Sequence, residues 1–122
     1  MNDNSTLNGL KVLVVEDEML VSMLVEDMLG DLGCTVVGPA AELEEAMSLA
    51  RSADIDLALL DVNLGGKPIF PVADALKARG VPFAFASGYG EAGLSEDHRG
   101  AAVLQKPFRE ADLAKALRGL VA

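Results

Sequence analysis

The chain has 122 residues, of which 51% are hydrophobic, and it carries a formal net charge of −9. This length and apolar content indicate one domain with a real core, and they argue against a second domain or a disordered chain. The acidic charge argues against non-specific nucleic-acid binding, which needs a basic face, and the apolar runs are too short and too broken by charge to span a bilayer.

The chain begins with a polar stretch, residues 1–8, that lacks the basic start and the apolar run of a secretory signal. We expect a disordered tail there, a domain over residues 9–122 and a cytoplasmic location. The one cysteine, Cys34, can form no internal disulfide, and we expect it to be a small buried apolar group. The acidic charge has two open interpretations: solubility alone, or a partner with a basic docking patch.

Short apolar runs alternate with amphipathic stretches along the rest of the chain. The runs are continuous, as in strands of a parallel sheet that is covered on both faces. They predict five strands, at residues 11–15, 35–37, 57–60, 83–86 and 102–104. Apolar residues at helical spacing predict four helices, within residues 21–32, 43–50, 72–80 and 113–121. Residues 88–100 are rich in glycine and poor in apolar residues, so we expect this segment to be short, frayed or mobile.

Five strands that alternate with helices predict the α/β class, in the form of a doubly wound sandwich with right-handed crossovers. In such sheets, ligands bind beyond the carboxyl ends of the strands, where the strand order reverses. Polar residues stand at the ends of four of the predicted strands. The sequence therefore predicts a functional site at one edge of the sheet.

Carboxylates follow two of the predicted strands. Glu16 and Asp17 come directly after the first strand, and Asp61 comes directly after the third. Carboxylates that share a pocket need positive charge nearby, and Mg²⁺ suits a site with a few carboxylates and several waters. We expect Asp17 and Asp61 to be direct ligands, Glu16 to contribute through a water, and the backbone carbonyl of Asn63 to supply another oxygen. An acidic pair after a strand is more often a simple helix start, so this prediction depends on the residues that accompany it.

A lysine and a hydroxyl complete the predicted site. Lys106 follows the fifth strand, where it can pair with Asp61 at rest and with a phosphoryl oxygen afterwards. Ser87 follows the fourth strand and offers a hydroxyl donor, although taken alone it is equally well explained as a turn residue. The combination predicts phosphoryl transfer, with Asp61 as a carboxylate nucleophile. His98 stands outside these segments, and we expect it to be an exposed polar residue and not a phosphate carrier.

In their order and spacing, these residues resemble the receiver domain of response regulators. The resemblance extends over residues 10–122, and its motifs are Val15-Glu16-Asp17-Glu18, Leu60-Asp61, Ala86-Ser87-Gly88 and Lys106-Pro107-Phe108. It implies a flavodoxin-like (βα)₅ sandwich with a five-stranded parallel sheet in the order 2-1-3-4-5. It also implies Asp61 as the phosphoacceptor, Ser87 and Lys106 as its catalytic partners, Mg²⁺ or Mn²⁺ as the cofactor, and a sensor histidine kinase as the phosphoryl donor.

Residues 82–90 are similar to the signature of the FAT GUY receivers, with serine in place of the usual threonine. Those receivers are typical of alphaproteobacteria and work with sensor kinases of the HWE or related classes. Most receivers carry an aromatic switch residue on the fifth strand, but Val103 stands there in this chain. Tyr89 is a candidate substitute for the switch, or alternatively an ordinary half-buried aromatic. Residues 62–68 lack the commoner Met-Pro pattern, so we expect a more flexible loop in which Asn63 helps to place a hydrolytic water.

The leading hypothesis is a stand-alone, monomeric response regulator that signals by protein contact, without nucleic-acid or membrane partners. Its docking face would be formed by residues 88–100, the fifth strand and the last helix. The alternative is a phosphate sink or relay receiver for a hybrid kinase, and the sequence does not separate the two. A small Mg²⁺-dependent phosphohydrolase is a remote alternative, because Asn63 occupies the place of the second acid that turnover needs. A purely structural binding module would have little use for Asp17, Asp61 and Lys106 at converging strand ends.

Overall fold

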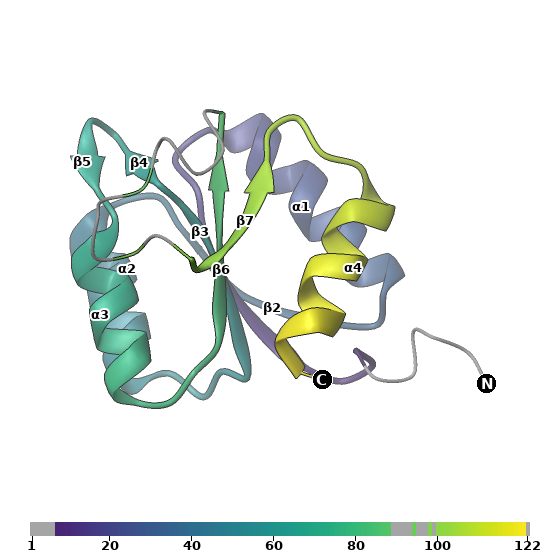
Figure 1. Ribbon diagram of the computed structural model, residues 1–122, viewed down its shortest axis with the longest axis horizontal. Coiled ribbons are helices and arrows are strands. Elements are labelled where there is room, and N and C mark those ends of the chain that lie inside the picture. The colour runs from purple at the N-terminus through teal and green to yellow at the C-terminus, as the bar shows by residue number, and fades with distance from the viewer. Residues whose placement is uncertain (1–6, 89–93, 95–97, 99, 122) are drawn as a thin grey trace.

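The computed structural model describes residues 7–88, 94, 98 and 100–121 of the chain. Within them, a five-stranded parallel sheet in the order β2-β1-β3-β6-β7 lies between two pairs of helices (Figure 1). Its strands are β1 (Lys11–Val15), β2 (Thr35–Ala40), β3 (Leu57–Asp61), β6 (Phe83–Ser87) and β7 (Ala102–Gln105). The helices are α1 (Met19–Asp31), α2 (Leu43–Ser52), α3 (Phe70–Ala78) and α4 (Glu110–Val121). The predicted flavodoxin-like α/β sandwich with the order 2-1-3-4-5 is confirmed.

Alternate side chains of the central strands face opposite sides of the sheet, and helices cover both sides. α2 and α3 cover one face, where Leu13, Leu60 and Phe85 are fully buried. α1 and α4 cover the other face (Figure 1), where Val12 and Leu57 are fully buried. Because helices cover both faces of the sheet, the strands are continuous apolar runs in the sequence. Among the described residues, no helix combines the length and the apolar character that crossing a membrane would need.

Glycine and proline mark the helix boundaries where the sequence indicated them. α1 ends at Asp31, and Gly33 then turns the chain toward β2 with a φ of 83°. Pro71 is the second residue of α3, where the missing N–H costs nothing. The strands of the large sheet begin where predicted, and four of them extend one to three residues further.

The loop after β3 contains regular structure. Over residues 62–68, where the sequence predicts a flexible loop, the chain forms a short antiparallel hairpin of β4 (Asn63–Leu64) and β5 (Lys67–Pro68), and the flexibility stays a prediction. The turn between them is Gly65-Gly66, a pair that allows the positive φ angles of a tight hairpin.

The sequence predicts a disordered tail over residues 1–8, of which residues 1–6 lie outside the described residues. The prediction is wrong for Leu7, whose side chain is fully buried in the core beneath α1 and α4. The Cys34 thiol donates to the Leu7 carbonyl oxygen at 3.4 Å, and the Gly9 N–H donates to the Gly33 carbonyl oxygen at 2.8 Å. Cys34 is half-buried, and burial raises the pKa of its thiol.

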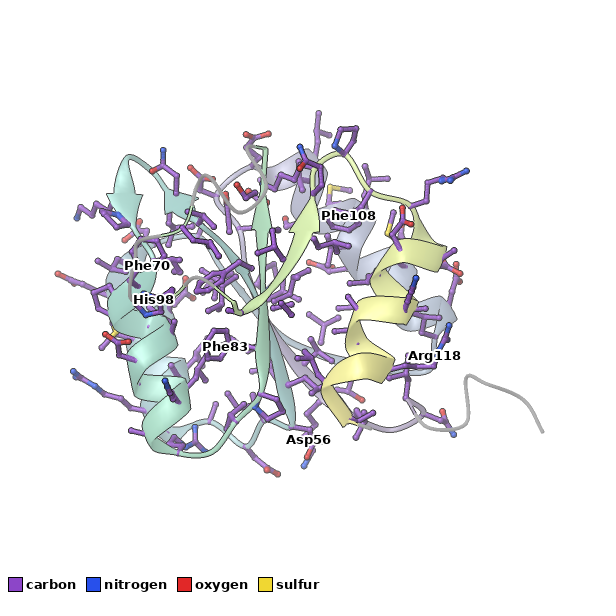
Figure 2. The ribbon with its side chains drawn as sticks, in the orientation of Figure 1. Asp56, Phe70, Phe83, His98, Phe108 and Arg118 are labelled. Atoms are coloured by element: carbon purple, nitrogen blue, oxygen red, sulfur yellow. The ribbon has the colours of Figure 1, made fainter. Side chains whose placement is uncertain are left out.

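His98 corrects another expectation, because its side chain is only 13% exposed. Its ring stacks on Phe70 with the centroids 4.7 Å apart (Figure 2). It also meets the ring of Phe85 edge-on, with the centroids 5.9 Å apart. Its Nε2 lies 2.9 Å from Oδ1 of Asp74 on α3. The prediction of a frayed segment over residues 88–100 falls largely outside the described residues, although Leu94 is buried in the core.

Of the two positions considered for a switch residue, Val103 and Tyr89, only Val103 lies within the described residues. Val103 is half-buried on β7, directly opposite Phe85 in the sheet register, so an aliphatic side chain fills this part of the core. Tyr89 lies outside the described residues.

Candidate functional site

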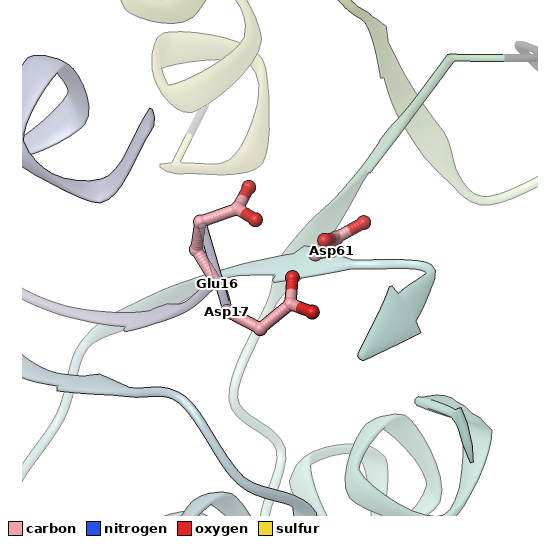
Figure 3. Close-up of side chains that lie close together, drawn as sticks. All are labelled: Glu16, Asp17 and Asp61. Atoms are coloured by element: carbon pink, nitrogen blue, oxygen red, sulfur yellow. The ribbon is translucent and has the colours of Figure 1, made fainter. Parts of the chain in front are cut away.

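The site lies at the carboxyl ends of β1, β3, β6 and β7, as the topology predicts. β1 and β3 are neighbours, with Val15 opposite Leu60, so the next residue on each strand, Glu16 and Asp61, emerges at the same edge. Asp17 follows Glu16. Figure 3 shows the carboxylates of Glu16, Asp17 and Asp61 converging on one space.

The three carboxylates are close enough to share one cation. One oxygen from each of Glu16, Asp17 and Asp61 lies within 4.8 Å of the others. Glu16 and Asp61 are 5% and 8% exposed, whereas Asp17 is exposed. Each of the three carboxylates accepts a backbone hydrogen bond. Glu16 Oε2 accepts the Glu18 N–H at 3.2 Å, and Asp17 Oδ2 accepts the Gly65 N–H at 2.9 Å. Asp61 Oδ1 accepts the Asn63 N–H at 3.4 Å. The cluster predicted from the sequence is therefore assembled by the fold.

Lys106 brings a positive charge to the same pocket. Its Nζ lies 2.8 Å from Glu16 Oε1 and 3.4 Å from Asp61 Oδ2, so it pairs with Glu16 more closely than with the predicted partner Asp61. Burial lowers the pKa of Lys106, but Glu16 and Asp61 together outweigh burial and raise it. The lysine is therefore a permanent cation at physiological pH.

The carboxyl of Asp61 is strongly perturbed by its surroundings. Burial is the largest cause, and the hydrogen bond and repulsion with Glu16 add to it, so that the pKa of Asp61 rises from its ordinary value of 3.8 to about 7. Lys106 and the Asn63 N–H act in the opposite direction. Strong perturbation of a buried carboxyl by like charge is a mark of functional sites.

Ser87 completes the arrangement at the end of β6. It is 3% exposed, and its carbonyl oxygen accepts the Lys106 N–H at 2.9 Å, which ties the ends of β6 and β7 together. Ser87, Lys106, Asp17, Asp61 and Asn63 all line one pocket of about 340 Å³. The fold therefore brings these five predicted residues to one pocket, and Glu16 lies beside it through its contact with Lys106. The role of the Asn63 carbonyl as a metal ligand stays a prediction.

The donor set fits a hard divalent cation. Three carboxylates supply only oxygen ligands, one of them exposed to water, and Mg²⁺ prefers a few carboxylates with several waters. The single ammonium group of Lys106 does not balance three ionised carboxylates, so the pocket has a deficit of positive charge that a cation can fill. Glu16, Asp17 and Asp61 would hold such an ion.

Two residues at the site were missed by the sequence analysis. Gln105 precedes Lys106, and its Nε2 donates to the Gly88 carbonyl oxygen at 3.0 Å, which fixes the turn after Ser87. Gly65 donates its N–H to Asp17. No sequence signal distinguishes Gln105 from an exposed edge-strand residue, whereas the Gly-Gly pair at 65–66 is a hairpin signal that could have been used.

The chain belongs to the response regulator receiver domain family, which it matches over residues 12–118. Receiver domains are phospho-accepting signalling modules, and the cluster of Glu16, Asp17 and Asp61 is the acidic Mg²⁺ site typical of the class.

The chain is similar to the solution structure of SdrG from Sphingomonas melonis Fr1, with 41% identity, a TM-score of 0.83 and 100% of both chains covered. It is also similar to the receiver domain of the sensor histidine kinase PA1611 from Pseudomonas aeruginosa PAO1, which holds a magnesium ion in its active-site cleft. That match has 26% identity, a TM-score of 0.77, and covers 93% of this chain and 98% of the other.

Among curated proteins, the transcriptional regulatory protein PdtaR from Mycobacterium tuberculosis H37Rv is 32% identical over 111 residues. The match covers 88% of this chain and 54% of PdtaR, so the chain spans about half the length of that relative.

Proposed function

We propose that this chain is a stand-alone response regulator of a two-component or phosphorelay system, in which Asp61 accepts a phosphoryl group from a sensor histidine kinase. The main support is the position of Asp61, at the end of the central strand β3, beside two further carboxylates and 3.4 Å from the Lys106 ammonium. A buried carboxylate between a cation site and a lysine is suited to attack phosphorus and to hold the transferred group.

The reaction would be a direct phosphoryl transfer. An oxygen of the ionised Asp61 carboxylate forms a bond to phosphorus, while the bond from phosphorus to the donor's imidazole nitrogen breaks and that nitrogen keeps the electron pair. Bound Mg²⁺ would supply positive charge close to the oxygens of the transferred group. The rest of the catalysis would come from positioning and electrostatics.

Lys106 and Ser87 would hold the product. Lys106 stays charged, and its Nζ can exchange contact with Asp61 for contact with a phosphoryl oxygen, since Lys106 and Asp61 line the same pocket. The Ser87 hydroxyl can donate to a second phosphoryl oxygen. Phosphorylation would thus draw the ends of β6 and β7 toward Asp61, and this movement would pass to the segment after Ser87.

We also propose the finer identity of the regulator. The sequence of residues 82–90 supports a FAT GUY receiver that is paired with a kinase of the HWE or a related class, and the match to SdrG over 100% of both chains supports a stand-alone receiver. The proposed receiver domain covers residues 9–122, together with Leu7. We further propose that it acts as a cytoplasmic monomer and docks its output partner on β7, α4 and the segment over residues 88–100.

Labelling with a small phosphodonor tests the proposal. In the presence of Mg²⁺ and phosphoramidate, the wild-type protein should gain the mass of one phosphoryl group, in a linkage that is stable to acid and labile to alkali. Asp61→Asn should abolish the gain. Asp56 is an exposed carboxylate that directly precedes β3, at the end of the strand far from the site. Asp56→Asn is therefore the matched control and should be labelled like the wild type. Undiminished labelling of Asp61→Asn would remove the proposal.

A further inference from the structure

The hairpin between β3 and α3 has a defined turn beside the acidic cluster. β4 and β5 pair antiparallel, with Leu64 opposite Lys67 at the last position before the turn. The two turn residues, Gly65 and Gly66, have φ angles of 57° and 85°. Positive φ at both central positions is typical of a type I′ turn, which glycine adopts without steric cost.

The hairpin is attached to the body of the domain independently of the acidic cluster. Leu64 and Ile69, on its two sides, are buried in the core covered by α2 and α3. At its base, the Ile69 N–H donates to the Val62 carbonyl oxygen, and the Val62 N–H donates to the Ala86 carbonyl oxygen on β6, both at 3.1 Å. The turn therefore has a set position relative to the sheet.

This turn directs a backbone donor at the exposed member of the cluster. The Gly65 N–H donates to Oδ2 of Asp17 at 2.9 Å. Asp17 is the exposed carboxylate, whereas Glu16 and Asp61 are buried and have less freedom. An exposed side chain samples several rotamers unless a fixed partner holds it, and ordering it on metal binding costs free energy.

We propose that Gly65 is a positioning residue for the metal site, because its N–H holds Asp17 in the orientation that lets three carboxylates share one Mg²⁺. The inference rests on the proposed function. One oxygen of Asp17 accepts the Gly65 N–H, and the other oxygen remains available to the cation. Gly65 thereby adjusts the metal affinity of the receiver through Asp17, without being a ligand itself.

The expected change in Mg²⁺ affinity can be estimated from groups that orient metal ligands in other proteins. Groups that orient metal ligands commonly change metal affinity by about 10- to 100-fold. A single neutral N–H on one of three ligands belongs at the lower end, so we expect its removal to weaken Mg²⁺ binding roughly 10-fold.

The sharpest test removes the Gly65 N–H and little else. Chemical synthesis of the chain with glycolic acid in place of Gly65 changes that amide to an ester. Mg²⁺ is titrated into the metal-free protein, and the dissociation constant is read from shifts of backbone amide resonances, a readout that does not depend on phosphorylation.

Two ordinary variants separate positioning from loss of stability. Leu64→Ala loosens the hairpin from the core. Leu57→Ala removes an equally buried leucine at the first position of β3, the end of that strand far from the site. Urea unfolding measures how closely the two variants match in stability. The Asp17–Gly65 contact should survive in Leu57→Ala and be lost in Leu64→Ala.

The inference predicts that the ester and Leu64→Ala both weaken Mg²⁺ binding roughly 10-fold, while Leu57→Ala stays within about twofold of wild type. It is overturned if the ester binds Mg²⁺ as tightly as wild type, or if Leu57→Ala weakens binding as much as Leu64→Ala. The proposed function is judged separately, since a wild-type chain that binds Mg²⁺ without accepting phosphate removes that proposal and leaves the positioning role standing. A wild-type chain that binds no Mg²⁺ overturns both.

Discussion

Replacing Asp61 with asparagine should stabilise the metal-free protein at neutral and alkaline pH. Two like charges 4.8 Å apart, the reach of the carboxylate cluster, repel by roughly 3 kcal/mol at an effective dielectric constant of about 20. The rise in the pKa of Asp61 from 3.8 to about 7 corresponds to roughly 4 kcal/mol of folding free energy at about 1.4 kcal/mol for each unit of pKa. Allowing for solvent relaxation, we expect a gain of about 2–3 kcal/mol in the free energy of unfolding.

The sign of the pH dependence follows from the raised pKa. Folded Asp61 holds its proton more tightly than the unfolded chain does, so its contribution to stability is complete below about pH 4 and is lost as the pH rises through about 7. The advantage of Asp61→Asn should therefore be small at pH 4, grow between pH 4 and 7, and be constant above pH 8.

Urea unfolding of the wild type and Asp61→Asn in EDTA, at several pH values, measures this difference. Saturating Mg²⁺ should cancel most of this difference, because an ion at about 100 times its dissociation constant stabilises the wild type by about 2.7 kcal/mol, whereas Asp61→Asn lacks one ligand and gains less. Asp56→Asn serves as the control and should show no comparable gain. An Asp61→Asn variant that is no more stable than wild type at pH 8 without metal would refute the reasoning.

Three further substitutions test other parts of the structure. Lys106→Met removes the cation beside Asp61 and should raise the pKa of Asp61 further. It should slow labelling by a small phosphodonor about 100-fold, as measured by mass spectrometry. An unchanged labelling rate would contradict the role of the lysine. Phe85→Ala should cost about 3–5 kcal/mol in urea unfolding, because the ring is fully buried and packs edge-on against two phenylalanines, and a loss below about 1 kcal/mol would be inconsistent with this core. Gly38→Ala should lower the free energy of unfolding by more than about 1 kcal/mol, because φ at Gly38 is 95° and the added Cβ would lie 2.8 Å from the backbone nitrogen of Ala40. The control Gly30→Ala, at an uncrowded helix position, should be neutral or stabilising. Equal effects of the two substitutions would show that the backbone at Gly38 is not constrained.

The sheet and most of the site could be predicted from the sequence because both follow from simple periodicity. Buried parallel strands read as continuous apolar runs, and the polar residue that ends such a run must stand at the carboxyl edge. Asp61, Ser87 and Lys106 could be placed in this way from the sequence alone, since parallel strands bring their ends together.

Other features depend on single contacts that no period encodes. Leu7 is one apolar residue in a polar stretch, and its burial follows from the packing of α1 and α4 around it. His98 has polar neighbours in sequence, and only the fold brings it against Phe70 and Asp74. The preference of Lys106 for Glu16 over Asp61 depends on rotamers and on distances that differ by less than an ångström.

The central claim is that Asp61, and no other carboxylate of the cluster, becomes phosphorylated. Borohydride reduction of the phosphorylated protein converts an aspartyl phosphate to homoserine, and peptide sequencing by mass spectrometry then locates the modified residue. The account predicts homoserine at position 61 in protein labelled with Mg²⁺ and phosphoramidate, and none in protein labelled in EDTA. Homoserine at position 17, a reduced glutamyl phosphate at position 16, or labelling that persists without metal would contradict it.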